Sequence, residues 1–469
     1  MPADPPAGGD RRSAPLDLSR PRRVHVVGVG GAGMSAIASV LAAMGNDVTG
    51  SDLKGSAAVE RLVASGVPVA VGHDPAHVGD AEVVAVSTAI PATNPEVVEA
   101  RRRGLPVLTR AEVLASIASR RRCVAVSGTH GKTTTTSMLA LVLVEAGLRP
   151  SFLIGGDVNE IGTNAVWDTG EWLVLEADES DGTFLHLDPE VAVVTNVEAD
   201  HLDHYGDFDH VVEAFDRFLT ARPGGCVVGA DDPVAARLGA RHGADLVGSG
   251  AGATVRIEAP AAGRDGASFD LRAHGELLGR VALPVTGANI ARNAAVAVAT
   301  ALRVGAPFDA AQRALARFAG VARRFEARGE TRGIRFVDDY AHLPTEVSAV
   351  IEAARGTAPQ RLVVVFQPHR YSRIASLGED FGDAFTGADV VVITDIFAAG
   401  EAPLPGVTGR VVADAVHRAH PDLDVAYVAG RAELLAHVTA TLEPGDLCLT
   451  LGAGDLTTLP DELQAAAPW

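Results

Sequence analysis

Short apolar runs recur along the chain, and each is followed by glycine or by a polar residue. The first run covers 24–28, a stretch with helical spacing of its apolar residues follows at 34–44, and a second run ends at Asp52. A further apolar run lies at 82–87. Strands and helices that alternate at this length are typical of a parallel sheet covered by helices. The pattern predicts a first α/β domain at residues 21–122.

The same alternation starts again at Cys123 and at Arg324. Within the second segment, residues 251–285 alternate apolar and polar positions with frequent glycine, which is typical of antiparallel strands. We therefore predict an α/β protein with two further domains, at 123–323 and 324–469. The expected strands in them are Cys123–Ser127, Trp172–Glu176, Val191–Asn196, Cys226–Gly229, Arg361–Gln367, Asp389–Thr394, Asp424–Val428 and Asp446–Leu451, and a helix is expected from Asn293 to about Arg303.

The composition is that of a globular protein, since 47% of the 469 residues are hydrophobic and 21% are charged. No apolar run approaches the roughly 20 residues that span a bilayer, and residues 1–20 lack the apolar centre of a secretion signal. We expect residues 1–20 to be a disordered tail, and the protein to work in the cytoplasm without stable membrane insertion. The net charge of −19 argues against nucleic acid as a partner. The cysteines all lie in apolar runs and are expected in the core: Cys123, Cys226 and Cys448.

A glycine loop with the sequence GTHGKT follows the strand expected at Cys123–Ser127. Backbone N–H groups and a helix N-terminus there would face an anion, Lys132 would reach the outer phosphates, and Thr133 could hold Mg²⁺. The loop is shorter than the common form, because Val126 stands where that form has a glycine. The alternative is an ordinary strand–turn–helix. The residues expected to bind the triphosphate are Gly128, Thr129, His130, Gly131, Lys132, Thr133 and Thr134.

Lysine usage supports a function for this loop. The chain has only two lysines, Lys54 and Lys132, whereas arginine supplies the other basic side chains. A compact ammonium on a flexible stem suits a polyphosphate. A lysine at position 132, in a chain that otherwise uses arginine nearly everywhere, therefore supports a phosphate-binding role for the loop.

A second glycine loop lies in the first domain, where it follows a strand and opens a helix. The spacing is that of the dinucleotide fingerprint, with an acid, Asp52, at the end of the next strand. Alone, this pattern fits an NAD-dependent dehydrogenase, or glycines that serve packing only. A second phosphate site in the same chain favours one nucleotide-carried substrate and one nucleoside triphosphate. The residues concerned are Gly28, Gly30, Gly31, Gly33 and Asp52.

Acidic and histidine residues follow the next two strands of the second domain. Glu176 is the first polar residue after one apolar run, and His201 lies in the segment after the next. The carboxyl ends of neighbouring parallel strands meet at one edge of a sheet, so Glu176 and His201 are our candidate metal ligands, together with Thr133. The other acids of these segments are interpreted as solvated charges or helix caps: Glu179, Asp203 and Asp207.

Together with the shortened phosphate loop, the stretches EADESD (176–181), NVEADHLDHYGDF (196–208) and DDYAHLP (338–344) resemble the Mur ligase family. The resemblance covers nearly the whole chain, from about Arg23 to about Asp455. It implies an N-terminal Rossmann-like domain for a UDP-sugar, a central P-loop ATPase domain and a C-terminal Rossmann-like domain for an amino acid. Among the members, the chain is most similar to those that use ATP and Mg²⁺ to join L-alanine to the carboxylate of UDP-N-acetylmuramate through an acyl phosphate. This is a step of peptidoglycan precursor synthesis that also yields ADP and phosphate.

The resemblance assigns further roles. It implies catalytic roles for Lys132, Glu176 and His201, and substrate as well as ATP contact for His130. It places Asn293, Arg324 and Asp339 at the ATP, and Tyr340, His342, Arg370 and Arg373 at the substrates. We expect the arginine pair to clamp the amino-acid carboxylate, and the protein to be a monomer or weak homodimer.

The chain departs from the family pattern at two places. Ala288-Asn289-Ile290 stands where a His-Asn pair is usual, and Leu343 replaces the second histidine of His-His-Pro. These departures concern adenine or amino-acid contacts and not the phosphate loop.

Three alternatives remain open at this stage: a recycling ligase that adds a whole tripeptide to the same sugar, a folylpolyglutamate synthase, and a non-catalytic relative. Sister ligases that add later residues use a carbamylated lysine after the metal histidine. No lysine follows Lys132 here, which favours the alanine-adding branch.

Overall fold

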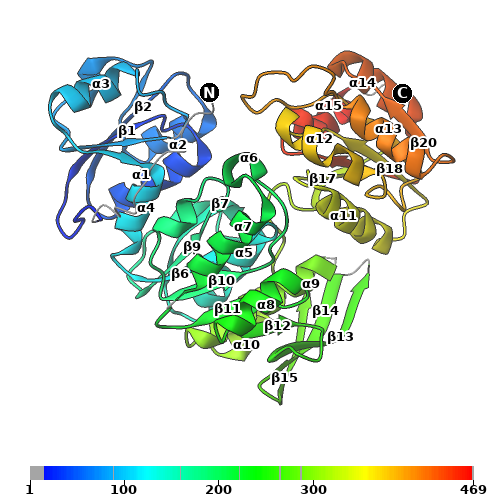
Figure 1. Cartoon of the computed structure of the whole chain (residues 1–469), viewed down its shortest axis with the longest axis horizontal. Coiled ribbons are helices and arrows are strands. Elements are labelled where there is room, and N and C mark those ends of the chain that lie inside the picture. The colour runs from blue at the N-terminus through cyan, green and yellow to red at the C-terminus, as the bar shows by residue number, and fades with distance from the viewer. Residues whose placement is uncertain are drawn as a thin grey trace.

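The chain folds around three separate sheets, one for each predicted domain (Figure 1). The computed structural model describes residues 15–87, 89–158, 160–220, 222–263, 266–285 and 288–466. The first domain and the third domain lie on opposite sides in Figure 1, and the central domain lies between and below them. No helix in these ranges is both long and apolar enough to cross a membrane.

The first domain holds a five-stranded parallel sheet in the order β3-β2-β1-β4-β5. The order reverses between β1 and β4, and the glycine loop that follows β1 lies at this switch point, where such sheets bind ligands. The elements are β1 (Arg23–Val27), α1 (Ala32–Ala43), β2 (Asp47–Asp52), α2 (Ala57–Ala64), β3 (Val69–Val71), β4 (Val83–Val86), α3 (Pro95–Arg102), β5 (Val107–Thr109) and α4 (Arg110–Ala118).

The central domain holds a ten-stranded sheet in the order β15-β14-β13-β12-β11-β10-β6-β9-β7-β8. The strands from β13 through β12 to β7 run parallel, whereas β14, β15 and β8 pair antiparallel with their neighbours. The phosphate-loop strand β6 thus lies between β9 and β10, the two strands that carry the predicted metal residues. Its strands are β6 (Arg122–Ser127), β7 (Ser151–Val158), β8 (Thr163–Val166), β9 (Trp172–Glu176), β10 (Val191–Val194), β11 (Cys226–Gly229), β12 (Asp245–Gly248), β13 (Val255–Gly263), β14 (Gly266–Ala273) and β15 (Glu276–Leu283).

The helices of the central domain include two that are almost wholly buried. The alanines of α9 pack against α5 in the core and allow the two helices to approach closely. The helices are α5 (Lys132–Glu145), α6 (Leu202–Tyr205), α7 (Phe208–Leu219), α8 (Pro233–Arg241), α9 (Ala288–Arg303) and α10 (Phe308–Leu315).

The third domain holds a six-stranded sheet in the order β16-β17-β21-β18-β19-β20, in which only β16 pairs antiparallel. Its helix α11 contacts α9 of the central domain (Figure 1). The elements are β16 (Glu326–Thr331), β17 (Ile334–Asp339), α11 (Pro344–Gly356), β18 (Arg361–Phe366), α12 (Tyr371–Leu377), β19 (Val390–Ile393), α13 (Arg410–Ala419), β20 (Asp424–Tyr427), α14 (Arg431–Thr441), β21 (Asp446–Leu451) and α15 (Leu459–Ala465).

The strands expected from the apolar runs are confirmed to within a few residues, and the cysteines are buried and free. The predicted helix near Asn293 begins five residues earlier, at Ala288. The short or amphipathic strands β3, β5, β7, β8, β12, β16 and β17 were not predicted.

The predicted tail needs a correction. Residues 1–14 of it lie outside the described residues. Beyond them, Leu18 is buried in the core and the backbone N–H of Leu16 donates to Oγ of Ser116 at 2.9 Å. The prediction of disorder was therefore wrong for residues 15–20, because two leucines there bury apolar surface.

Candidate active site

The phosphate loop joins β6 to α5 in a conformation that requires its glycines. Gly128 has φ +133° and Gly131, at the N-cap of α5, has φ +78°. A Cβ atom would lie 2.1 Å from Oγ1 of Thr195 at Gly128, and 2.5 Å from Oδ1 of Asn293 at Gly131. Any side chain would collide at both positions, so the backbone can approach a ligand closely at the start of α5.

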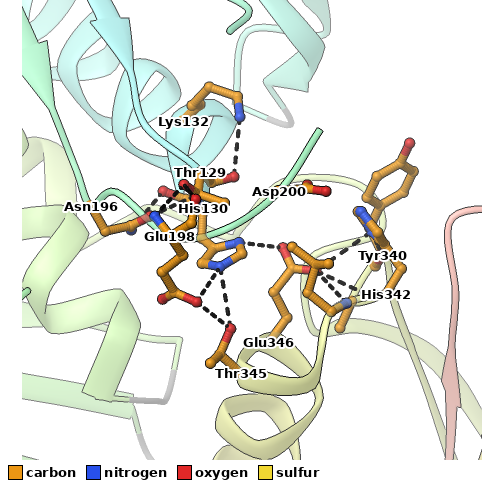
Figure 2. A network of polar contacts seen from close by, with 12 residues as sticks. Thr129, His130, Lys132, Asn196, Glu198, Asp200, Tyr340, His342, Thr345 and Glu346 are labelled. Atoms are coloured by element: carbon orange, nitrogen blue, oxygen red, sulfur yellow. Dashed lines mark hydrogen bonds and ion pairs between the residues drawn. The ribbon is translucent and has the colours of Figure 1, made fainter. Parts of the chain in front are cut away.

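The end of β10 holds this loop in place (Figure 2). The amide of Asn196 accepts from the backbone N–H of His130 at 2.8 Å and donates to its carbonyl at 3.1 Å. Oγ1 of Thr129 accepts from the N–H of Glu198 at 2.8 Å. The loop is thus rigidly connected to the neighbouring strand.

Lys132 turns back over the loop that precedes it. Its Nζ donates to the carbonyl oxygens of Gly128 at 2.7 Å and Thr129 at 3.2 Å, and to Oε1 of Glu179 at 2.8 Å. Burial opposes the charged ammonium, but Glu179 and Asp178 outweigh it and raise the pKa of Lys132. The ammonium therefore stays charged.

The interpretation of Glu179 as a solvated loop charge was wrong. Its side chain is only 4% exposed, because the segment after β9 folds back over the phosphate loop. Burial raises the pKa of Glu179 to about 7. Its second oxygen, Oε2, has no hydrogen-bond partner and is shielded from solvent. A buried carboxylate oxygen without a partner is costly, which is typical of a functional site.

Thr133 and Glu176 lie together beside the loop. Oγ1 of Thr133 donates to Oε1 of Glu176 at 2.9 Å, and the N–H of Gly155 donates to Oε2 at 2.6 Å. His201 lies in the same region, with its Nε2 at 3.2 Å from Asp200 and 3.7 Å from Glu179. Thr133 and Glu176 thus contact each other directly, whereas His201 reaches this region through Glu179, the partner of Lys132.

This donor set suits Mg²⁺. In the described ranges, no group of three or more histidine, cysteine or acidic side chains has the arrangement of a closed metal cage. Mg²⁺ does not need one, since it commonly uses one or two carboxylates, retained water and substrate phosphates. The hydroxyl of Thr133 and the carboxylate of Glu176 supply oxygen ligands of the preferred kind.

A cavity of about 520 Å³ opens beside the loop, between the central and third domains. Its size is within the usual range for small-molecule sites. Six of the residues that the sequence predicts for ATP line it: His130, Gly131, Thr134, Asn293, Arg324 and Asp339.

Asp339 closes one side of this cavity at the end of β17. Its carboxylate accepts from the backbone N–H groups of Phe325 and Ala341, each at 2.7 Å. Burial raises the pKa of Asp339 to about 6. The guanidinium of Arg324 lies 5.0 Å from the ring centre of Tyr340, so the start of the third domain is held to the loop after β17.

Arg373 does not lie open to a ligand, as a carboxylate clamp would. Its guanidinium is held by Asp200 of the central domain, with contacts of 2.9 and 3.3 Å to the two carboxylate oxygens, and its Nη1 lies 2.9 Å from Nδ1 of His369. Both members of the pair are buried. In this conformation Arg373 ties two domains together, and Arg370 lines a small pocket beside the pair.

Two buried histidines of the third domain, His342 and His369, are neutral at pH 7. Burial lowers the pKa of His342 to about 4 and that of His369 to about 3. Their rings lie 5.4 Å apart, and the ring of Tyr340 lies 5.4 Å from that of His342. The predicted substrate residues Tyr340 and His342 thus belong to one aromatic cluster beside Asp200 (Figure 2).

The first glycine loop lies in its own domain. Gly28 has φ +77°, Gly31 caps α1 without a side-chain hydrogen bond, and the N–H of Gly30 donates to Oδ2 of Asp52 at 2.8 Å. A Cβ atom at Gly33 would lie 3.1 Å from Nε of Arg110, whose Nη1 reaches Asp178 of the central domain at 3.3 Å. The loop is therefore connected to the segment that carries Glu179.

The two departures from the family pattern are accommodated. Asn289 lines the cavity and accepts from Nη1 of Arg292 at 3.2 Å. Leu343 is buried as the N-cap of α11. Because the leucine side chain is apolar, its burial leaves no side-chain polar group without a hydrogen-bond partner.

Sequence reasoning missed several residues of the site. Four of them follow strands in stretches that it did quote, and the fifth lies near the start of α11, two residues after such a stretch, but their partners lie far away in the chain. These residues are Glu179, Asn196, Glu198, Asp200 and Glu346.

Three family models match the chain in succession. They describe the catalytic domain of the Mur ligase family at residues 23–122, the Mur ligase middle domain at 126–301, and the Mur ligase glutamate ligase domain at 323–454. The chain belongs to the Mur ligase family. A UDP-N-acetylmuramate–L-alanine ligase of Rubrobacter xylanophilus is 47% identical over 449 residues, which cover 94% of this chain and 99% of that protein.

Solved Mur ligases have the same three-domain architecture. The UDP-N-acetylmuramate-alanine ligase of Thermotoga maritima superposes with a TM-score of 0.79 at 28% identity, over 95% of this chain and 99% of that one. A murein peptide ligase of Psychrobacter arcticus, at 24% identity, gives a TM-score of 0.69 over 95% and 98% of the two chains. The second likeness shows the fold alone.

Proposed function

We propose that this Mur ligase joins L-alanine to the carboxylate of UDP-N-acetylmuramate and converts ATP to ADP and phosphate. The observation that carries the proposal is the contact between Thr133 and Glu176 next to Lys132, in a chain 47% identical to an alanine-adding ligase along almost all of its length. The same loop lines the cavity through His130 and Gly131. The reaction is a step in peptidoglycan precursor synthesis. We place it in the cytoplasm, where ATP and nucleotide-linked sugars are available.

The chemistry needs an activated carboxylate. A carboxylate oxygen attacks the γ-phosphorus of ATP, ADP leaves, and an acyl phosphate forms. The charged ammonium of Lys132, 2.8 Å from Glu179 in this structure, would move to the phosphate oxygens and stabilise the charge that builds up there. The neutral amine of alanine then attacks the acyl carbon, and phosphate leaves.

Thr133, Glu176 and His201 would hold Mg²⁺ at the phosphates. When bound, the ion offsets the charge on the transferring phosphoryl group. Glu176 accepts from the Thr133 hydroxyl and the Gly155 amide, and these bonds fix its carboxylate beside the loop.

The UDP-sugar and ATP would bind at two separate places. The loop at Gly28 and Asp52 would bind the UDP part of the sugar substrate, and the cavity lined by Asn293 and Asp339 would bind ATP. The aromatic cluster at Tyr340 and His342 would face the amino acid. We keep the prediction that the protein is a monomer or weak homodimer.

The experiment that tests the function compares amine substrates. Phosphate release is measured with UDP-N-acetylmuramate, ATP and Mg²⁺, in the presence of either L-alanine or the L-Ala-γ-D-Glu tripeptide of the recycling reaction. We expect turnover with L-alanine. Turnover with the tripeptide alone would assign the chain to the recycling ligases, and no turnover with either would favour a non-catalytic relative.

A further inference from the structure

Glu346 connects the start of α11 to the phosphate loop, 216 residues away in the chain. Its Oε1 lies 3.0 Å from Nδ1 of His130, and its Oε2 accepts from the backbone N–H groups of His342 at 2.9 Å and Leu343 at 3.2 Å. One carboxylate therefore contacts the phosphate loop, the start of helix α11 and the segment that carries His342 (Figure 2).

The imidazole of His130 lies between acids from two domains. Its Nε2 is 3.2 Å from Oε2 of Glu198, which follows β10, and Oγ1 of Thr345 donates to the same oxygen at 2.8 Å. The side chains of His130 and Glu346 are only 16% and 10% exposed. Charged pairs with so little access to water interact more strongly than surface pairs and are less screened by salt.

A second buried pair joins the same two domains, where Arg373 holds Asp200. The third domain is thus fixed to the central one at both the phosphate end and the substrate end of the site. Of these two ion pairs, the one at Glu346 includes a residue of the phosphate loop itself, and Oγ1 of the neighbouring Thr345 also lies 3.3 Å from Nε2 of His130.

We propose that Glu346 is a positioning residue, which couples docking of the third domain to the phosphate loop and so keeps phosphate release tied to amide formation. The inference rests on the proposed ligase activity. An acyl phosphate that forms before the amine is in place can react with water. When Glu346 holds His130, the segment that carries Tyr340 and His342 stands at a fixed place relative to the reacting phosphate.

A simple helix-capping role is the alternative, and the chain offers a matched control for it. Glu112 occupies the same N3 position in α4, where its carboxylate accepts from the N–H of Thr109 at 2.8 Å. It lies in the first domain and contacts no part of the phosphate loop. Glu112→Ala therefore removes a cap alone, whereas Glu346→Ala removes a cap and the contact with His130.

The test measures phosphate released per amide formed, with UDP-N-acetylmuramate, ATP, Mg²⁺ and L-alanine. We expect a ratio of one for the unchanged protein and for Glu112→Ala. For Glu346→Ala we expect a ratio several-fold above one and an amide kcat about 10- to 100-fold lower, with the KM for ATP nearly unchanged. Glu346→Gln, which can still accept from both backbone N–H groups, should lie between them, and it replaces the alanine variant if that one does not fold.

A second measurement separates this inference from the proposed function. Small-angle scattering of the nucleotide-free proteins should give a larger radius of gyration for Glu346→Ala than for the unchanged protein or Glu112→Ala. A ratio of one together with an unchanged radius, in a protein that makes the amide, would overturn the inference and leave the function standing. A protein that makes no amide, but whose Glu346→Ala variant expands, would overturn the function and support the interdomain contact.

Discussion

The ammonium of Lys132 lies 2.8 Å from a carboxylate oxygen of Glu179, whose side chain is buried, and the Lys132 side chain itself is only 16% exposed. The lysine that a triphosphate needs is therefore held by an acid and two loop carbonyls in this structure. The positive charge of Lys132 is therefore already present in the site and largely shielded from solvent.

Loss of this lysine should abolish catalysis and not folding. We expect Lys132→Ala to lower kcat by at least about 100-fold, because one donor to the charge of the transition state disappears. Glu179, with its pKa near 7, can take up a proton and remain buried without its partner. Phosphate release and circular dichroism measure the two effects, and Lys54→Ala, at the exposed second lysine, is the control. Retained activity in Lys132→Ala would mean that the loop has another role.

The metal site should depend on the Thr133 hydroxyl. We expect Thr133→Val to raise the half-saturating Mg²⁺ concentration by about 10-fold or more, and chelation to stop turnover in the unchanged protein. Thr133→Ser keeps an oxygen 2.9 Å from Glu176 and should stay close to the unchanged protein. A Mg²⁺ titration of phosphate release gives all three values, and equal values for the valine and serine variants would exclude Thr133 as a ligand.

The sequence could predict what local patterns encode. The strands that end at Ser127 and Glu176 are continuous apolar runs. The glycines at 128 and 131 mark a loop whose conformation leaves no room for a side chain at either position. The tertiary pairs could not be predicted. Glu346 meets His130 only because the third domain docks on the central one, and no periodicity near either residue indicates a partner 216 residues away.

The same reason explains the errors. The sequence around Glu179, with other acids beside it, is typical of a solvated loop, and only the fold shows that this segment covers Lys132. The clamp at Arg370 and Arg373 followed from the family resemblance and stays a prediction, and in this structure Arg373 pairs with Asp200. The strands β16 and β17 contain no long apolar run, because β16 is mostly polar and β17 carries Arg335 and ends in two aspartates.

Docking of the third domain should weaken in alkali. Burial opposes the charge on His130, but Glu346 and Glu198 raise its pKa to about 9. A raised pKa means that the stabilisation is complete below the ordinary value near 6.5 and is lost as the pH rises from there to about 9. The share of it that Glu346 supplies is the share that favours docking. The radius of gyration should therefore grow over this window. Glu346→Gln should show a smaller change, and an equal change in both proteins would assign the titration to another group.

The first domain should lose stability in acid through Glu96. This side chain is fully buried, and hydrogen bonds from His25, Ser51 and His77 outweigh burial and lower its pKa to about 2. Its contribution is present above the ordinary carboxyl pKa of 4.5 and is lost as the pH falls towards 2.

Glu96→Gln should cost about 3 kcal/mol of unfolding free energy at pH 7, and the difference from the unchanged protein should shrink below pH 4.5. Denaturant unfolding at several pH values measures it. Glu99→Gln, on the same helix but paired with Arg102 at the surface, should cost less than about 1 kcal/mol. An equal loss of unfolding free energy in the two variants would show that the buried hydrogen bonds of Glu96 add no more stability than the surface pair.

The most direct test of the proposed reaction follows oxygen. UDP-N-acetylmuramate with an ¹⁸O-labelled carboxylate is incubated with the protein, ATP, Mg²⁺ and L-alanine, and the masses of the products are determined by mass spectrometry. Activation as an acyl phosphate predicts an L-alanyl amide that keeps one ¹⁸O, together with one released phosphate that carries the other. Unlabelled phosphate, or labelled phosphate with no amide, would contradict the account.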